Sequence, residues 1–311
     1  MINENADSSD QAQIANGGPL SLRENSTSAV WPRASTQVAA VIGDPVRHSL
    51  SPVLLNAAFM QRGMDWVYIA FEVPKGAGSA AVEAARTLGI RGMSVTMPHK
   101  EAVFESLDGV SETAGVLRAV NTIVARGPKL FGENTDGEGF VNALREAVDW
   151  DPAGRDCIVF GAGGAARAVV LALASRGAAS IGIVGRNSVR SAAAVSLAGA
   201  VGRIAVAEEV AAAQLIVNAT PVGMSGLAGG HDARLLVRPE DLGSGQVVVD
   251  LVYQPRITRL LETAHSRGAT AVGGVGMLVH QAAIAFKLWT GEEAPLQAMW
   301  DALSSEGPKR S

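Results

Sequence analysis

A glycine-rich turn between two apolar runs carries the clearest chemical signal in this sequence. Residues 161–166, Gly-Ala-Gly-Gly-Ala-Ala, match the pattern G-x-G-x-x-A directly after an apolar run that ends at Phe160. The first glycine of such a turn permits a tight bend, the second lets a pyrophosphate approach the backbone, and free N–H groups at the following helix start bind the phosphate. A helix-length segment and a second strand-like run follow, so we favour a dinucleotide site over a simple turn of small residues. The expected cofactor-binding residues are Gly161, Ala162, Gly163, Gly164 and Ala165.

Two arginines after the second apolar run indicate which dinucleotide binds. An NAD site normally places Asp or Glu about 20 residues after the turn, where the carboxylate binds the ribose 2′-hydroxyl. The chain instead continues as Arg186-Asn187-Ser188-Val189-Arg190, without a carboxylate. Two guanidinium groups can clamp a 2′-phosphate, whereas a merely solvated arginine pair would oppose the dipole of the helix that starts here. The sequence therefore predicts NADP as the cofactor, bound in part by Arg186, Asn187 and Arg190.

The elements that must position these residues alternate along the chain. Strand-like runs are expected at 38–46, 66–74, 90–98, 216–220 and 247–253, with two short ones within 121–136 and a strand-turn-helix-strand unit over 156–187. Helices are expected at 51–63, 78–89, 139–148 and from 277 onward, and another helical stretch ends at Arg118. Ser51 is the expected N-cap of the first of these helices, with Pro52 as its first residue. This alternation, with nearly continuous apolar strands, predicts an α/β fold of two units with mainly parallel sheets.

Composition excludes several other classes of protein. The net charge is -4, with 26 Lys and Arg against 30 Asp and Glu, so no basic excess exists to bind nucleic acid. The single cysteine and five histidines show no metal-ligand spacing, and glycines and Arg167 interrupt the most apolar stretch, residues 157–174. Residues 1–37 are polar and resemble neither a signal nor a transit peptide. We therefore expect a flexible N-terminal tail on a cytoplasmic protein without a metal, a nucleic-acid partner or a membrane span.

Several further segments carry a family resemblance. They are GDPVRHSLSP at 43–52, GMSVTMPHK at 92–100, AVNTI at 119–123, GENTDG at 132–137, NATPVGM at 218–224, DLVYQP at 250–255 and GVGMLVHQ at 274–281. In this order, between about residues 38 and 291, they resemble the signatures of the shikimate dehydrogenase family, and the combination is far more specific than any single motif.

The resemblance implies a domain organisation and a reaction. A substrate-binding and catalytic domain would cover residues 38–138, a Rossmann-type NADP-binding domain 139–275, and C-terminal helices at 276–311 would return to the first domain. The implied reaction is the reversible NADPH-dependent reduction of 3-dehydroshikimate to shikimate, an oxidation of a CH–OH group in the other direction, within aromatic amino acid biosynthesis. The enzyme would be a monomer or a homodimer.

The resemblance also assigns the substrate contacts and the proton chemistry. Ser49 and Ser51 would receive the carboxylate of shikimate, although Ser51 read alone is simply an N-cap. Lys100 would exchange the proton of the reacting hydroxyl, and Asp136 would orient that ammonium and bond the same hydroxyl. A lone lysine after Pro-His is usually a solvated charge, and only its place in the motif reverses that interpretation. Further substrate-binding residues implied by the family are Thr96, Asn121, Tyr253 and Gln281.

The nicotinamide end of the cofactor is expected where the two domains meet. Gly274 would let the backbone approach the ring, and Leu251 lies where the family's backbone contacts it. Glu112 occupies a position sometimes found beside the cofactor, although an acid in a helical stretch is more often solvent-facing. Thr220 is a neighbouring candidate.

Two departures from the family pattern keep alternative functions open. The family commonly has His where Leu55 stands and Asn where Ser94 stands. Serine lacks the amide's extra donor and acceptor, which would loosen discrimination among related hydroxy acids. One alternative is therefore a relative that acts on quinate or an aminoshikimate analogue. Another is a non-catalytic sensor of shikimate-type ligands, against which the intact Lys100 and Asp136 count.

Overall fold

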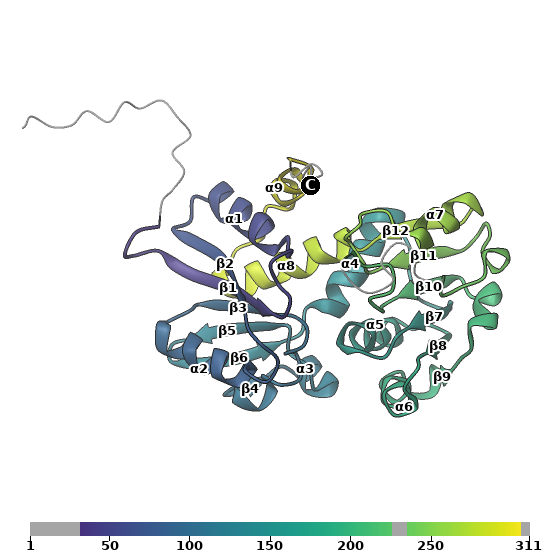
Figure 1. The fold of residues 1–311 in the computed structure, drawn as a ribbon, viewed down its shortest axis with the longest axis horizontal. Helices are drawn as coiled ribbons and strands as arrows, with labels where there is room; N and C mark the ends of the chain where they lie inside the picture. The colour runs from purple at the N-terminus through teal and green to yellow at the C-terminus, as the bar shows by residue number, and fades with distance from the viewer. Residues whose placement is uncertain (1–31, 226–234, 306–311) are drawn as a thin grey trace, which may run out of the picture. The chain divides into compact units, whose positions relative to one another are not determined.

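The computed structural model describes residues 32–225 and 235–305, and these contain two six-stranded sheets (Figure 1). The first sheet is built from strands β1 to β6 in the order β2-β1-β3-β5-β6-β4. Only β5 runs antiparallel to its neighbours, β3 and β6. The strands are β1 (Gln37–Gly43), β2 (Trp66–Glu72), β3 (Gly92–Val95), β4 (Gly109–Val110), β5 (Thr122–Arg126) and β6 (Lys129–Glu133).

Helices cover both faces of this first sheet. One face packs against α1, α8 and α9 through a cluster that includes Leu54, Phe59 and Phe286. The other face packs against α2, α3 and the segment between β3 and β4. Val82 and Val103 are among the apolar side chains in this contact. The helices are α1 (Ser51–Gln61), α2 (Gly78–Leu88), α3 (Glu112–Leu117), α8 (Val275–Thr290) and α9 (Leu296–Ser305). Helix α8 thus packs on the same sheet as β1, although β1 ends at Gly43 and α8 begins only at Val275.

The second sheet is entirely parallel and has the strand order β12-β11-β10-β7-β8-β9. The order reverses between β7 and β10, which is the doubly wound arrangement of a Rossmann-type sheet, in which a ligand binds at the carboxyl ends of the strands at the reversal. The strands are β7 (Asp156–Phe160), β8 (Ser180–Val184), β9 (Gly202–Ile204), β10 (Leu215–Asn218), β11 (Val247–Asp250) and β12 (Thr270–Gly273).

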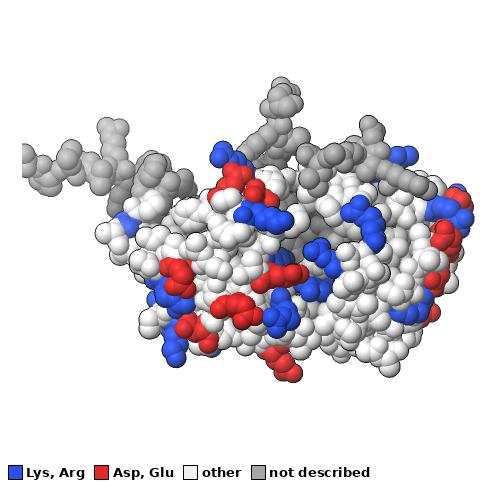
Figure 2. Space-filling model, turned by 60° about the horizontal axis from the view of Figure 1, so that its bottom comes forward, with Lys and Arg blue, Asp and Glu red and all other residues white. Residues whose placement is uncertain are grey.

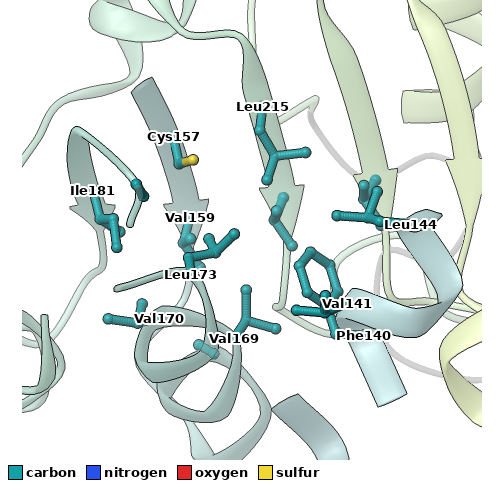
Figure 3. Close-up of a cluster of buried hydrophobic side chains, with 14 of the residues drawn as sticks. Phe140, Val141, Leu144, Cys157, Val159, Val169, Val170, Leu173, Ile181 and Leu215 are labelled. Atoms are coloured by element: carbon teal, nitrogen blue, oxygen red, sulfur yellow. The ribbon is translucent and has the colours of Figure 1, made fainter. Parts of the chain in front are cut away.

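Apolar strands of the second sheet are buried on both faces. Figure 3 shows one face, where Phe140 and Leu144 of α4 and Leu173 of α5 gather against Val159 of β7 and Leu215 of β10. A second cluster, around Ile158, Ile216 and Val248, covers the opposite face. The remaining helices are α4 (Asp136–Val148), α5 (Gly164–Ser175), α6 (Ser188–Leu197), α7 (Arg259–Ser266) and four 3-10 helices, η1 to η4 (Phe104–Ser106, Gly199–Val201, Ala207–Ala212 and Pro239–Asp241). The predicted α/β class with two mainly parallel sheets is therefore confirmed.

Two helix starts differ from the sequence prediction. Helix α1 begins at Ser51 with Leu50 as N-cap, so the expected capping role of Ser51 was wrong. The reason is that the Ser49 hydroxyl accepts a hydrogen bond from the Ser51 N–H at 3.3 Å and supplies the local partner instead. Helix α4 begins at Asp136 and not near Gly139, because the Asn134 side chain accepts from the Asp136 N–H at 3.2 Å.

The predicted N-terminal tail, residues 1–37, lies outside the described residues except for its last six, and the expected domain boundaries at 138/139 and 275/276 stay predictions. Within the described ranges no helix is long and apolar enough to cross a membrane. On the face shown in Figure 2, Lys and Arg side chains are mixed with Asp and Glu over most of the surface, and several Lys and Arg lie beside the central hollow.

Candidate active site

An ion pair joins the two residues that the sequence puts forward for proton chemistry. The Lys100 ammonium donates to Oδ2 of Asp136 at 2.5 Å. The Asp136 side chain is 6% exposed and that of Lys100 is 19% exposed, so little water competes for the pair. The Lys100 side chain is still partly accessible to a reactant, and the Asp136 carboxylate holds its ammonium in place.

The carboxylate of Asp136 is itself held from the other side. Asn121 donates from Nδ2 to Oδ1 of Asp136 at 2.8 Å and to the Thr135 hydroxyl at 2.9 Å. The side-chain oxygen of Asn121, Oδ1, accepts from the Thr135 N–H at 2.8 Å. Both carboxylate oxygens of Asp136 therefore accept from donors. Asp136, Asn121 and Thr135 are buried, and Lys100 is half-buried. Asn134 and Thr135 were not expected from the sequence as site residues, although both stand in the GENTDG segment.

The strand ends of the first sheet place these groups side by side. Strand β3 leads into residues 96–100, and the Lys100 carbonyl accepts from the Val120 N–H at 2.8 Å, which anchors the lysine's backbone next to β5. Half-buried Thr96 follows β3, and its methyl group would lie 2.4 Å from a Cβ on Gly43. The carboxyl ends of β1 and β3 are thus packed tightly at the edge where Lys100 stands.

The expected substrate contacts on the helices lie near the same edge. Ser49 is half-buried just before α1, and the buried side chain of Ser51 makes no hydrogen bond with any other described residue. Half-buried Gln281 lies on α8, where its side chain donates to the Leu278 carbonyl at 2.8 Å. A Cβ on Gly139 would meet the backbone nitrogen of Gln281 at 2.7 Å, so this glycine allows α4 and α8 to cross closely.

The glycine turn lies at the reversal of strand order in the second sheet. Gly161 has φ +112°, and a Cβ there would lie 2.9 Å from the Ala219 carbonyl, so both the backbone conformation and the space demand glycine. A Cβ on Gly163 would meet nothing within 4 Å, so the start of α5 has an open face. A Cβ on Gly164 would lie 3.5 Å from the side chain of Lys100. The turn is therefore adjacent to the candidate catalytic lysine.

The residues proposed for the 2′-phosphate surround the start of α6. Asn187 is the N-cap and accepts from the Arg190 N–H at 2.9 Å. Arg186 and Arg190 are exposed, and neither makes an ion pair within the described ranges. Two guanidinium groups thus flank a capped helix start, and Asn187 has a structural role that the sequence interpretation did not separate from binding.

A buried carboxylate that the sequence analysis missed organises the loops after β10 and β11. Asp250 is 0% exposed and accepts from Asn218 at 2.9 Å, from the Val252 N–H at 3.0 Å and from the Thr258 hydroxyl at 2.6 Å. Burial raises the pKa of Asp250, and these hydrogen bonds only partly oppose the rise. The signal was available, because Asn218 and Asp250 open the NATPVGM and DLVYQP segments.

This carboxylate fixes the neighbourhood of three predicted site residues and of the neighbouring candidate Thr220. Thr220 donates to the Asn218 side chain at 2.7 Å, and Leu251 follows Asp250 directly. A Cβ on Gly274 would lie 2.3 Å from the Leu251 carbonyl, so Gly274 and Leu251 are brought together as expected for two parts of one pocket wall. Tyr253 is half-buried on the same loop, and burial raises its pKa.

The two departures from the family pattern occupy different surroundings. Leu55 is fully buried in the apolar cluster under α1, where it packs as a hydrocarbon. Ser94 is 9% exposed on β3 beside Tyr68, whose buried hydroxyl has no hydrogen-bond partner in the described part of the chain. Burial raises the pKa of Tyr68. Tyr68 was not expected from the sequence.

The role of Glu112 beside the cofactor stays a prediction. Glu112 is exposed on the first turn of α3 and has no hydrogen bond or ion pair to any of the predicted site residues. No group of three or more His, Cys, Asp or Glu side chains within residues 32–225 and 235–305 could hold a metal ion.

Comparison with known proteins identifies the family. The model of the shikimate dehydrogenase substrate binding domain matches residues 41–123, and that of the shikimate 5'-dehydrogenase C-terminal domain matches residues 274–303. The chain is 47% identical over 280 residues to the shikimate dehydrogenase (NADP(+)) of Methanopyrus kandleri, covering 87% of this chain and 96% of that protein.

Solved structures of shikimate dehydrogenases also resemble this chain. A shikimate dehydrogenase crystallised with NADP+ superposes with a TM-score of 0.83 at 36% identity, covering 89% of this chain and 97% of the other. The shikimate 5-dehydrogenase of Thermus thermophilus, in complex with NADP(H) and shikimate, superposes with a TM-score of 0.79 at 36% identity, covering 87% and 99%. The buried Lys100 and Asp136 pair beside a dinucleotide turn, and relatives that match over almost their whole length, place this chain in the shikimate dehydrogenase family.

Proposed function

We propose that this chain is an NADP-dependent shikimate dehydrogenase, which reversibly reduces 3-dehydroshikimate to shikimate in aromatic amino acid biosynthesis. The observation that carries the proposal is the Lys100–Asp136 ion pair, buried beside the glycine turn at Gly164. Hydride transfer to a carbonyl needs a proton at the oxygen of the same carbon, and this pair puts an ammonium next to the cofactor's turn.

The loops at the carboxyl ends of the second sheet carry groups that could bind the phosphates of NADP. The positive φ of Gly161 suits the tight bend of a pyrophosphate-binding turn, and the open face at Gly163 would let phosphate reach the first N–H groups of α5. Arg186 and Arg190 would hold the 2′-phosphate through charge-assisted bonds. Gly274 and Leu251 would form the wall of the nicotinamide pocket. When bound, the nicotinamide supplies or accepts the hydride.

Lys100 and Asp136 would handle the proton. Because Oδ2 of Asp136 accepts from Lys100 and Oδ1 accepts from Asn121, the carboxylate cannot rotate without breaking a hydrogen bond. The ammonium is consequently fixed in one position, from which it can donate a proton to the carbonyl oxygen of 3-dehydroshikimate. In the reverse direction the neutral amine would accept the proton of the hydroxyl.

The remaining polar groups would orient the substrate. Ser49, Ser51 and Tyr253 would hold the carboxylate, and the Ser51 hydroxyl has no competing partner among the described residues. Thr96, Asn121, Asp136 and Gln281 would bond the ring hydroxyls. Holding a small substrate by several short side chains fixes its reacting carbon against the hydride donor. A cytoplasmic monomer or homodimer that binds no nucleic acid stays a prediction from the sequence.

The serine at position 94 keeps a second substrate under consideration. Ser94 is shorter than the Asn that the family commonly carries, so this position beside Tyr68 offers one donor and one acceptor fewer. Quinate or an aminated analogue of shikimate is the alternative substrate that this difference favours.

A spectrophotometric assay tests the proposed function. The purified protein is incubated with shikimate or quinate and with NADP or NAD, and the reduced nicotinamide is followed by absorbance. We expect the highest kcat/KM with shikimate and NADP. Higher kcat/KM with quinate would favour the alternative substrate, and no turnover in any of the four combinations, together with thermal stabilisation by shikimate, would indicate a sensor.

A further inference from the structure

A second ion pair lies next to the catalytic lysine, and neither the proton chemistry nor cofactor binding accounts for it. Arg167 donates from its guanidinium to the carboxylate of Glu101 at 2.5 Å. The two residues are 66 positions apart in the chain. Glu101 directly follows Lys100, and Arg167 lies on α5, the helix that starts with the glycine turn. The pair therefore links the lysine's segment to the cofactor's helix.

The location of Arg167 is unfavourable for a cation on its own. It is the fourth residue of α5, and its N–H bonds to the Gly163 carbonyl at 2.9 Å, so it belongs to the first turn. A positive charge there opposes the helix dipole unless an anion lies nearby. The side chain is 16% exposed, and its Nε is buried without a hydrogen-bond partner in the described ranges. Glu101 is the only carboxylate there that pairs with this guanidinium.

The lysine's segment is in contact with α5 at more than one point. The side chain of Lys100 runs past Gly164, and the Lys100 carbonyl is tied to Val120. Beside it, Leu117 and Ala119 pack against Ala168, the residue after Arg167, in a small apolar cluster. The apolar contact and the ion pair thus both join α5 to the chain that follows Lys100.

We propose that Arg167 and Glu101 are positioning residues, which set the distance of the Lys100 ammonium from the cofactor bound at the start of α5. Asp136 and Asn121 orient the ammonium with respect to the substrate, and α4, which begins at Asp136, packs closely on α5, because a Cβ on Gly137 would lie 2.8 Å from the Ala168 carbonyl. A second constraint, acting on the residue next to Lys100, would hold the lysine's own segment at the first turn of α5. The Glu101–Arg167 pair supplies that second constraint. This inference rests on the proposed function, because it assigns a role in the same reaction.

The exposure of Glu101 separates this role from a purely structural one. Its side chain is 62% exposed, and exposed ion pairs contribute little to the free energy of unfolding. Replacing Arg167 by Gln should therefore leave the thermal unfolding midpoint nearly unchanged, because this change also removes the cation from the first turn of α5. Small displacements of a reacting group, in contrast, strongly reduce the rate of the chemical step, so we expect kcat to fall on the order of 10-fold.

The test is a double-mutant cycle with Glu101→Gln, Arg167→Gln and the double variant, assayed beside the unchanged enzyme. Each single variant should lower kcat, with KM for shikimate and Kd for NADPH close to those of the unchanged enzyme. The double variant should be no slower than either single variant, because one interaction is lost in all three. Arg167→Lys, which keeps a cation, should recover most of the lost kcat.

Two matched controls use ion pairs of the same kind nearby. Arg176→Gln removes the pair of α5 with Glu138, measured at 2.6 Å, at the other end of that helix. Glu105→Gln removes the pair with Arg118 in the segment after Glu101. Both variants should keep the kcat of the unchanged enzyme.

Several outcomes would overturn the inference. One is an unchanged kcat in Glu101→Gln and Arg167→Gln, and another is a pair of losses that multiply in the double variant. A third is an increased Kd for NADPH in Arg167→Gln but not in Glu101→Gln, which would make Arg167 a direct cofactor contact. If the unchanged protein itself does not oxidise shikimate, the proposed function fails instead, and the two failures are thereby distinguished.

Discussion

The ammonium of Lys100 and the carboxylate of Asp136 lie 2.5 Å apart, although 36 positions separate them in the chain. Lys100 lies in the segment that follows β3, and Asp136 is the first residue of α4. Asn121 holds the second carboxylate oxygen, so the position of the lysine depends on three segments of the chain. This relationship yields the most direct prediction of the proposed mechanism.

Replacing Lys100 by Ala should remove the proton donor and leave the cofactor site intact. We expect kcat to fall by about 10²-fold or more, as is typical when a general acid or base is lost. Steady-state kinetics with shikimate, together with fluorescence titration of NADPH, measure the two effects. Lys287→Ala, which removes the exposed pair with Glu293, is the control and should retain full activity. Near-normal turnover of Lys100→Ala would rule out its assignment.

Replacing Arg186 by Ala should change the preference between the two nicotinamide cofactors. The guanidinium is exposed beside the start of α6 and would bond only the 2′-phosphate, which NADH lacks. Hydrogen bonds to charged groups contribute enough that Kd for NADPH should rise about 10-fold or more, with little change for NADH. Arg238→Ala, whose guanidinium pairs with Asp241, is the matched control. Equal effects on NADPH and NADH would reject the phosphate clamp.

Replacing Ser94 by Asn should sharpen the choice of substrate. The amide adds a donor and an acceptor beside Tyr68, whose hydroxyl has no partner among the described residues. We expect the ratio of kcat/KM for shikimate to that for quinate to rise about 10-fold, as when a polar group becomes fixed by the site. Ser94→Ala, which removes the hydroxyl, should not raise the ratio. An unchanged ratio in Ser94→Asn would mean that residue 94 does not set substrate range.

Replacing Asp250 by Asn should reduce the pH dependence of stability. Because burial raises the pKa of Asp250, the folded state binds its proton more tightly than the unfolded state does. The resulting stabilisation is complete below the ordinary pKa of 3.8 and is lost as pH rises through the higher pKa of the folded state. Denaturant unfolding from pH 3.8 upward should show a smaller decline in the variant.

The isosteric amide is the right replacement at this position because it keeps the contacts of Asp250. Its oxygen can still accept from Asn218 and the Val252 N–H, and its nitrogen can donate to the Thr258 hydroxyl. Asp250→Ala loses all three bonds and should be strongly destabilised at every pH, by about 1–3 kcal/mol for each donor left without a partner. A pH dependence in Asp250→Asn equal to that of the unchanged protein would contradict the assignment.

The sequence by itself determined the fold class and the position of the glycine turn. Both depend on local properties: the spacing of apolar residues specifies strand or helix, and the turn at Gly161 needs a backbone conformation that only glycine adopts easily. The motifs around Lys100 and Asp136 could also be recognised from the sequence, because each motif is a continuous segment of the chain.

The tertiary structure alone decided which groups hydrogen-bond to one another. The sequence placed an N-cap at Ser51, whereas the folded chain uses Leu50 and the Ser49 hydroxyl. The motifs that Asn218 and Asp250 open did not show which donors bury Asp250, and nothing in the sequence indicated that Glu101 pairs with Arg167. The physical reason is that the energy of a polar contact depends on burial and on partners distant in the chain, and both arise only when helices and sheets have packed.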